Sequence, residues 1–143
     1  MVARLTSVWP IACALGLPIP SRGQAPAPAC SEPVQIVQSQ GDAFNRHDLD
    51  AFVAFYSPNV QLSLLPADTV VVADTATLRQ KYAFLREVPP GFGVDITERM
   101  VTGCFVIDHE RFRAVSGRPA REAGIAIYQV EGRLIRRVWF AFP

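Results

Sequence analysis

Residues 43–60 read AFNRHDLDAFVAFYSPNV, and the pattern of this stretch predicts a pair of consecutive helices. Its apolar residues recur at the i, i+3, i+4, i+7 spacing of an amphipathic helix: Leu49, Phe52, Val53 and Tyr56. Asp48 is placed to cap this helix, and Ser57-Pro58 to end it. A similar stripe runs back from Phe44, so a first helix is expected to begin at 31–33, with Ser31 as its cap.

Downstream of this stretch the pattern changes to strands. Val60–Leu64 alternates like a half-buried strand, and Val70–Val72 is predicted as a second short strand. Asp74 caps a third helix, which ends at Pro89-Pro90-Gly91. Hairpin turns at 116–117 and 131–132 separate the later strands, which are predicted over 94–98, 100–112, 121–130 and 134–142. This order predicts a single α+β domain, with helices on one face of an antiparallel sheet.

Length and composition are those of one folded domain. The chain has 143 residues, of which 50% are hydrophobic and 19% charged, enough to form a core. The formal net charge is +1, and no run of basic residues occurs. This balance argues against a nucleic acid or an anionic membrane surface as partner.

The N-terminal residues 1–29 have the layout of a signal peptide. Arg4 precedes an apolar run over Leu5–Ile19, and Ala27-Pro28-Ala29 fits a cleavage site between small residues. The run is too short and too interrupted by proline for a membrane span. The domain is therefore predicted over 30–143 of an exported chain, periplasmic or secreted. Processing as a lipoprotein on Cys30 is the alternative, because cleavage would leave that cysteine first.

Two cysteines remain after the leader, Cys30 and Cys104. In an oxidising compartment they can form one disulfide. Alternatively, Cys104 is a buried apolar thiol in a strand and Cys30 an ordinary terminus.

Three motifs carry a resemblance to a known superfamily: Ala43–Phe52, Phe55–Val60 and Ile127–Ile135. Together they resemble the nuclear transport factor 2 superfamily, in its SnoaL-like and steroid delta-isomerase-like branch. The resemblance covers essentially all of the chain after the leader. It implies a cone-shaped curved sheet wrapped by three helices, a cystatin-like α+β barrel with an apolar cavity at its open end. It does not fix the function, because the superfamily includes isomerases, cyclases, dehydratases, epoxide hydrolases and non-catalytic binders.

The catalytic groups of the steroid isomerases are missing at the matching positions. That chemistry needs a carboxylate base and a Tyr–Asp pair that stabilises the enolate oxygen. Matching the motifs without gaps places Gln40 at the tyrosine position, Leu64 at the base and Ala126 at the aspartate. We therefore expect that this particular mechanism does not operate here. No CxxC, HExxH, P-loop, GxSxG or GxGxxG pattern occurs either, so no cofactor and no metal is expected.

The same matching predicts which strand residues face the cavity. If Ala126 points inward, alternation along strands carries Glu122 and Tyr128 to the same face. His109 takes that face on the third strand if no bulge intervenes. The ligand pocket is then predicted to contain Phe52, Tyr56, Leu64, Tyr82, Ile107, Tyr128, Arg137 and Trp139.

His109 and Glu122 are the candidate catalytic pair. A hairpin near 116–117 places them roughly opposite each other, so the carboxylate could orient the imidazole and raise its basicity. The alternative is a polar pair at the rim of the cone, partly solvated and without a catalytic role.

Three functions follow from these expectations. The first is an exported module that binds a small apolar or amphipathic molecule without turnover. The second is an isomerase, cyclase or lyase that uses His109 and Glu122. The third is a dimeric scaffold whose pocket is merely core. A homodimer is expected through the outer face of the sheet, with its apolar area supplied by Ile125, Ile127, Val138 and Phe140.

Overall fold

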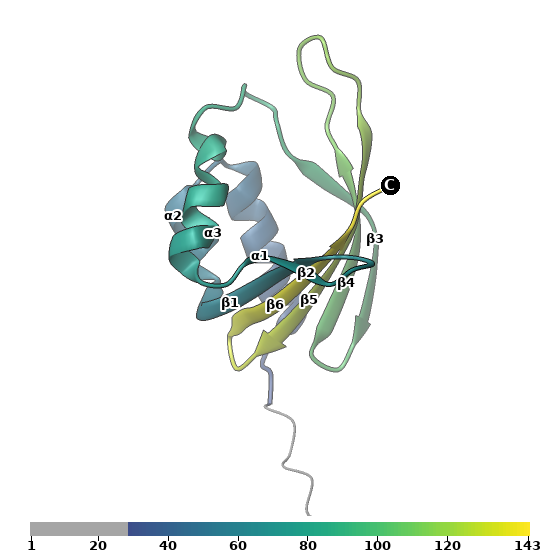
Figure 1. The fold of residues 1–143 in the computed structure, drawn as a ribbon. Helices are drawn as coiled ribbons and strands as arrows, with labels where there is room; N and C mark the ends of the chain where they lie inside the picture. The colour runs from purple at the N-terminus through teal and green to yellow at the C-terminus, as the bar shows by residue number, and fades with distance from the viewer. Residues whose placement is uncertain (1–28) are drawn as a thin grey trace, which may run out of the picture.

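The computed structural model describes residues 29–143, which form three α-helices and a six-stranded sheet (Figure 1). The predicted signal peptide lies outside the described residues, apart from Ala29. The helices are α1 (Pro33–Asn45), α2 (Leu49–Ala54) and α3 (Thr75–Lys81), followed by the 3₁₀ helix η1 (Ala83–Arg86). The strands are β1 (Tyr56–Leu64), β2 (Thr69–Val72), β3 (Val94–Thr102), β4 (Phe105–Phe112), β5 (Arg121–Glu131) and β6 (Leu134–Ala141).

The sheet is open and mixed, with the strand order β2-β1-β6-β5-β4-β3. Its strand pairs are antiparallel except β1 with β6, which run parallel. The three helices lie together on one side of the curved sheet (Figure 1). The predicted single α+β domain is thus confirmed, whereas a purely antiparallel sheet was wrong in the β1–β6 pair.

The helix starts follow the predicted caps at two of three places. Asp48 accepts a hydrogen bond from the amide of Ala51, and Asp74 accepts one from the amide of Thr77. Ser31 does not cap α1: Glu32 occupies that position, without a side-chain cap hydrogen bond, and Pro33 starts the helix. A proline there needs no partner for its nitrogen, which carries no hydrogen.

The strand predicted over 100–112 is in fact two strands. β3 continues through Thr102, and the chain then turns at Gly103, whose φ of 55° lies in the left-handed region that glycine adopts without strain. β4 begins at Phe105 and pairs with β3 over its whole length. The predicted break near Arg99 was therefore misplaced.

One apolar core lies between the helices and the sheet. Its largest fully buried apolar side chains include Phe52, Leu62, Leu78 and Ile135. Within residues 29–143, no helix has the length and apolar character needed to cross a membrane.

A disulfide joins Cys30 to Cys104, with 5.6 Å between their Cα atoms. The bridged alternative is therefore the one the structure adopts. The bond fastens the segment before α1 to the turn between β3 and β4. Backbone hydrogen bonds hold the same segment against the turn between β5 and β6, because Gly132 donates to Ala29 and accepts from Ser31.

Candidate functional site

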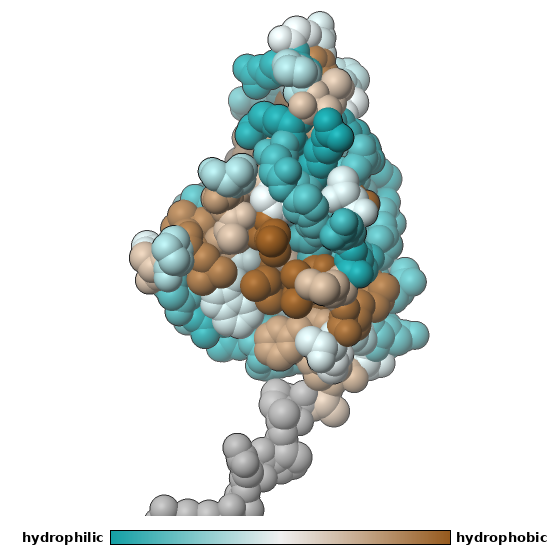
Figure 2. Space-filling model, turned by 90° about the vertical axis from the view of Figure 1, so that its right-hand side faces the viewer, coloured by the Kyte–Doolittle hydropathy of each residue, from teal (hydrophilic) through white to brown (hydrophobic). Residues whose placement is uncertain are grey.

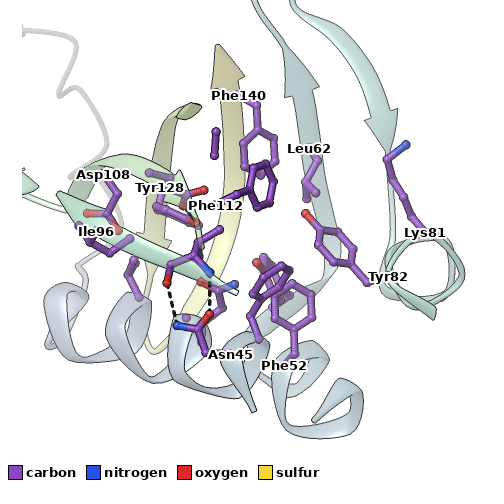
Figure 3. Close-up of a pocket in the computed structure, with 18 of the residues that line it drawn as sticks. Asn45, Phe52, Leu62, Lys81, Tyr82, Ile96, Asp108, Phe112, Tyr128 and Phe140 are labelled. Carbon is purple, nitrogen blue, oxygen red and sulfur yellow. Dashed lines mark hydrogen bonds between the residues drawn. The ribbon is translucent and has the colours of Figure 1, made fainter. Parts of the chain in front are cut away.

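A cavity of about 470 Å³ lies between the helices and the concave face of the sheet (Figure 3). Most of its wall is aromatic or aliphatic: Phe44, Phe52, Leu62, Phe92, Phe112 and Phe140. Asn45 at the end of α1 closes one side, because its amide both donates to and accepts from the backbone of Val94, each over 2.9 Å. These two bonds hold the helix against the first residue of β3.

The predicted pocket residues fall into two groups. The following residues line the cavity: Phe52, Tyr56, Leu64, Tyr82 and Tyr128. Ile107, Arg137 and Trp139 do not, and their placement in the pocket was wrong. Gln40 and Leu64, at the matched isomerase positions, also line the cavity, and Ala126 is fully buried.

An irregularity in β6 explains the error for Arg137 and Trp139. Val130 pairs with Ile135, but Gln129 pairs with Arg137, so Arg136 is an extra residue on β6. This bulge reverses the alternation beyond Ile135. Val138 and Phe140 therefore face the core and the cavity instead of the outer surface.

The two misassigned side chains meet on the other face of the sheet. The Arg137 guanidinium lies 4.6 Å from the ring centroid of Trp139 and forms an ion pair of 3.1 Å with Asp68. On β4, Ile107 pairs directly with Ile127 and shares this outer face.

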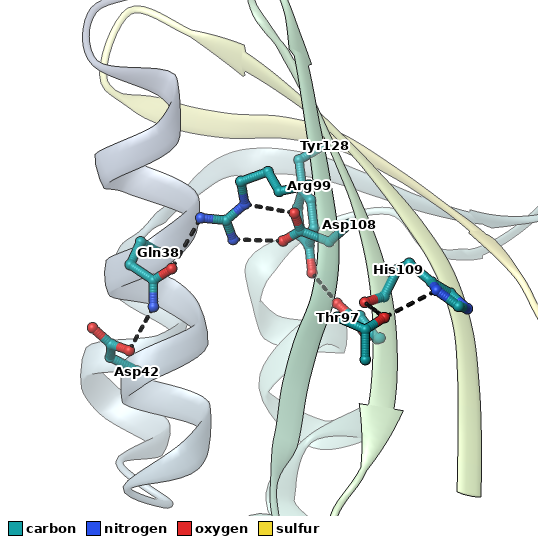
Figure 4. Close-up of polar contacts among 8 residues, drawn as sticks. Gln38, Asp42, Thr97, Arg99, Asp108, His109 and Tyr128 are labelled. Atoms are coloured by element: carbon teal, nitrogen blue, oxygen red, sulfur yellow. Dashed lines mark hydrogen bonds and ion pairs between the residues drawn. The ribbon is translucent and has the colours of Figure 1, made fainter.

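His109 and Glu122 do hydrogen-bond to each other, but on the outer face of the sheet. Their side chains are 37% and 51% exposed. His109 Nδ1 also lies 3.0 Å from Oγ1 of Thr97. Glu122 raises the pKa of His109, chiefly through the hydrogen bond between these two side chains. In Figure 4 His109 lies on the opposite side of β4 from Asp108.

A bulge in β5 turned Glu122 outward. Glu110 pairs with Gly124 and Arg111 with Glu122, so Ala123 is the extra residue. Gly124 adopts a φ of 121°, which permits the bulge. Ala123 takes the place at the cavity wall that was predicted for Glu122. The arrangement matches the solvated polar pair and not a catalytic element of the cavity.

The structure instead places two carboxyl groups of β4 in the cavity, and the first is ion-paired. Asp108, which is 1% exposed, accepts hydrogen bonds from Nε and Nη2 of Arg99 over 2.6 and 2.7 Å. The Arg99 Nη1 donates to Gln38 on α1, and Gln38 donates to Asp42, each over 2.9 Å (Figure 4). Asp108 holds the pKa of Arg99 above its usual range. The buried charge of Asp108 is thereby compensated.

The second carboxyl group, Glu110, has no cationic partner at hydrogen-bond distance among residues 29–143. Tyr128 donates a hydrogen bond to its Oε1 over 2.9 Å. Burial raises the pKa of Glu110 to about 7, with a further contribution from the charge of Asp108, whereas the Tyr128 hydrogen bond opposes the shift. At neutral pH this carboxyl group therefore exists in both protonation states, which is what a general acid or base requires.

Sequence reasoning missed Arg99, Asp108 and Glu110. Asp108 and Glu110 flank His109 in the sequence. Because the prediction placed His109 on the inward face of the strand, alternation placed its two neighbours on the outer face. Gly124 within a predicted strand was the signal that pointed to a bulge.

As for metals, residues 29–143 contain no group of three or more His, Cys, Asp or Glu side chains that is placed to hold an ion.

Comparisons with known proteins agree on the fold. Residues 37–138 match the family profile of the SnoaL-like domain. No curated protein matches the chain. A solved structure of an uncharacterized cystatin fold protein from Novosphingobium aromaticivorans is 21% identical, with a TM-score of 0.64 over 77% of this chain and 97% of that one.

Two further solved structures carry functional descriptions. One, from Kribbella flavida, is described as a candidate ketosteroid isomerase and is 17% identical, with a TM-score of 0.62 over 78% of this chain and 77% of that one. The other, an LEH-like epoxide hydrolase of M. tuberculosis, is 16% identical, with a TM-score of 0.60 over 78% of this chain and 82% of that one. At these identities the likeness establishes the fold. Because the family profile spans most of the chain, the protein belongs to the SnoaL-like domain family, within the nuclear transport factor 2-like superfamily.

Proposed function

We propose that the cone cavity binds a small, largely apolar molecule, with a polar group of that molecule beside Glu110 and Tyr128. The observation that carries this proposal is the composition of the cavity. Its wall is mainly aromatic and aliphatic, and Arg99, Asp108, Glu110 and Tyr128 contribute polar atoms from adjoining strands. Small-molecule sites have this form: an apolar wall with a few convergent polar groups.

Gly41 supports an open cavity. It lies within α1 and lines the cavity, and a Cβ added there would meet no heavy atom within 4 Å. A glycine inside a helix costs about 0.5–1 kcal/mol relative to alanine, so Gly41 does not stabilise the fold. In the proposed function the glycine leaves room for a ligand.

Filling this space tests the binding function. The probe is N-phenylnaphthylamine, an uncharged dye whose fluorescence rises in apolar sites. We expect Gly41→Phe to abolish its binding, because the new ring projects into the cavity, while the matched variant Gly41→Ala retains it. Equal binding by wild type and Gly41→Phe would contradict the proposal. Circular dichroism spectra of both variants establish that they fold.

Catalysis is the second candidate function, and the protonation behaviour of Glu110 favours it. A carboxyl group with a pKa near 7 inside an apolar cavity can remove a proton from a bound molecule and return it elsewhere. Such a step underlies isomerase- and lyase-type reactions. In this candidate Tyr128 orients the carboxyl group through its hydrogen bond.

Deuterium exchange tests this second candidate without a known substrate. Small apolar ketones that bind the protein are incubated in heavy water, and exchange beside the carbonyl is followed by proton NMR. Glu110→Gln should slow exchange by roughly 10²–10⁴-fold, the usual contribution of a general base. Glu122→Gln, the same change on the outer face, should leave the rate unchanged. Exchange that is no faster with wild type than in buffer would contradict catalysis and leave binding alone.

Self-association is part of the proposal, through the outer face of the sheet. Directly paired residues of four neighbouring strands form an apolar row there: Met100, Ile107, Ile127 and Trp139. Figure 2 shows apolar residues gathered over the lower half of one side of the molecule. Val138 and Phe140, once expected in this surface, belong to the interior. Ile127→Glu should convert a dimer to a monomer in analytical ultracentrifugation. A wild type that is monomeric at every protein concentration measured would contradict the proposed self-association.

Export in soluble form completes the proposal. The Cys30–Cys104 disulfide supports it, since such bonds persist in oxidising compartments. The sulfur of Cys30 cannot be both lipidated and bridged, so the bond also disfavours the lipoprotein alternative. Expression of the full chain, followed by fractionation and intact mass analysis, should find a chain beginning at Cys30 and lighter than its reduced form by two hydrogens. A lipidated chain in the membrane fraction would contradict soluble export.

A further inference from the structure

We propose that the ligand of the cavity carries an acidic group, such as a carboxylate or sulfonate, and that Lys81 binds this group. The inference rests on the proposed binding function and specifies the class of ligand. It starts from the position of one residue. Lys81 is the only lysine of the chain, and it lines the cavity from the end of α3.

The ammonium group of Lys81 is available to a ligand. Its side chain is exposed at the cavity, and within the described residues it has neither an ion pair nor a hydrogen bond. Its neighbour on the same helix, Arg79, is instead paired with Asp50 outside the cavity. Of these two cations on α3, Lys81 is therefore the one free to pair with a bound molecule.

The other charges of the cavity do not compensate Lys81. Arg99 and Asp108 neutralise each other through two hydrogen bonds. Glu110 lies beside Tyr128, and its pKa of about 7 leaves it only partly ionised at neutral pH. The Lys81 charge is thus left in excess at a mainly apolar wall, which favours an anionic group on the ligand.

The positions of these groups indicate an elongated ligand. In Figure 3 Lys81 lies at one end of the cavity and Asp108 at the other, with Tyr82 and Phe140 between them. An apolar body between the two ends can contact these rings, while its acidic group reaches Lys81 and a second polar group reaches Glu110. A long lysine side chain suits this position because its stem can lie on the apolar wall while its charge remains hydrated.

Two dyes of related skeleton separate charge from apolar contact. Anilinonaphthalene sulfonate carries a sulfonate, whereas its parent N-phenylnaphthylamine is uncharged. Lys81→Met should weaken sulfonate binding about fivefold, the scale of a solvent-accessible ion pair, and leave binding of the uncharged dye unchanged. Lys81→Arg should restore sulfonate binding. Arg79→Met, the matched loss of one positive charge from α3, should change neither affinity.

Each contrary outcome identifies what fails. If wild type binds the uncharged dye but Lys81→Met leaves sulfonate binding unchanged, the acidic-group inference is overturned and the binding function stands. The inference is also overturned if Lys81→Met weakens both dyes equally, or if Arg79→Met weakens sulfonate binding as much. If wild type binds neither dye, the proposed binding function itself is overturned.

Discussion

The hydroxyl of Tyr128 donates a hydrogen bond to Oε1 of Glu110 over 2.9 Å, from β5 to the neighbouring strand β4. Two opposing effects act on the protonation of the Glu110 carboxyl group. Burial favours the neutral carboxylic acid, whereas a hydrogen bond received from a hydroxyl favours the carboxylate. Burial is the larger effect, and Glu110 therefore changes its protonation state near neutral pH.

The first prediction concerns the pH dependence of stability. The pKa of Glu110 is about 7 in the folded chain, against an ordinary value of 4.5, so the folded state holds the proton more tightly than the unfolded state. The free energy of unfolding should therefore fall as pH rises from about 4.5 to about 7, by at most about 3 kcal/mol. Glu110→Gln should remove this fall.

Urea unfolding at about pH 5 and about pH 8 measures the effect as a difference between variants. The charged groups that face Glu110 are Asp108 and Arg99, which remain in both proteins. Glu87→Gln, at an exposed position directly after η1, is the matched control and should keep the wild-type pH dependence. A Glu110→Gln variant with the same pH dependence as wild type would show that Glu110 is not buried as a neutral acid.

The fold was predictable from local sequence patterns. Helical spacing located α1 and α2, Asp48 and Asp74 marked helix starts, and glycine-containing turns separated the later strands. The predicted end of α2 was wrong, because Tyr56 and Ser57-Pro58 belong to β1. The parallel pairing of β1 with β6 had no such local signal, because it joins segments far apart in the chain. Distant pairing follows from packing of the whole domain, and a single-sequence pattern does not report it.

The site was predictable only in part, for a geometric reason. Alternation along a strand assigns faces correctly until a bulge adds one residue, after which every later side chain changes face. Tyr128 was assigned correctly because no bulge separates it from Ala126, whereas the extra residues Ala123 and Arg136 reversed the assignments of Glu122 and Trp139. Phe52 on α2 and Tyr82 directly after α3 were unaffected, since their placement was predicted from helical spacing.

A second prediction concerns the buried ion pair. Asp108→Asn leaves the guanidinium of Arg99, whose side chain is 18% exposed, without its carboxylate. We expect a loss of about 3 kcal/mol in unfolding free energy, because one charge remains without compensation. The paired change Arg99→Met with Asp108→Leu should recover at least half of this loss, as no charge then remains buried.

The surface pair of Asp95 with Arg113 provides the control for this prediction. Asp95→Asn removes an exposed ion pair of the same chemistry and should cost less than about 1 kcal/mol. Chemical denaturation of wild type, of the two single variants and of the double variant measures their free energies of unfolding. Equal losses for Asp108→Asn and Asp95→Asn would mean that the Arg99–Asp108 pair is not buried in solution.

A third prediction contrasts two glycines. A Cβ at Gly124 would lie 2.2 Å from the carbonyl oxygen of Ala141, and the φ of 121° is one that alanine rarely adopts. Gly124→Ala should therefore lower the free energy of unfolding by at least about 2 kcal/mol. Gly41→Ala, in open space on a helix, should instead raise it by about 0.5–1 kcal/mol. Thermal unfolding followed by circular dichroism measures both, and a tolerated Gly124→Ala would argue against the β5 bulge.

The last prediction concerns the disulfide. Cys30 and Cys104 are separated by 74 residues, so their bond restricts a long loop of the unfolded chain. Replacing both by serine should lower the free energy of unfolding by about 4 kcal/mol in the loop-entropy model. Dithiothreitol should destabilise wild type by a similar amount and leave the double-serine variant unchanged. The uncharged dye should still bind the reduced protein, because neither cysteine lines the cavity. If dithiothreitol changes the stability of neither protein, the two cysteines are not bridged in solution, and the support that the bond lends to export is lost.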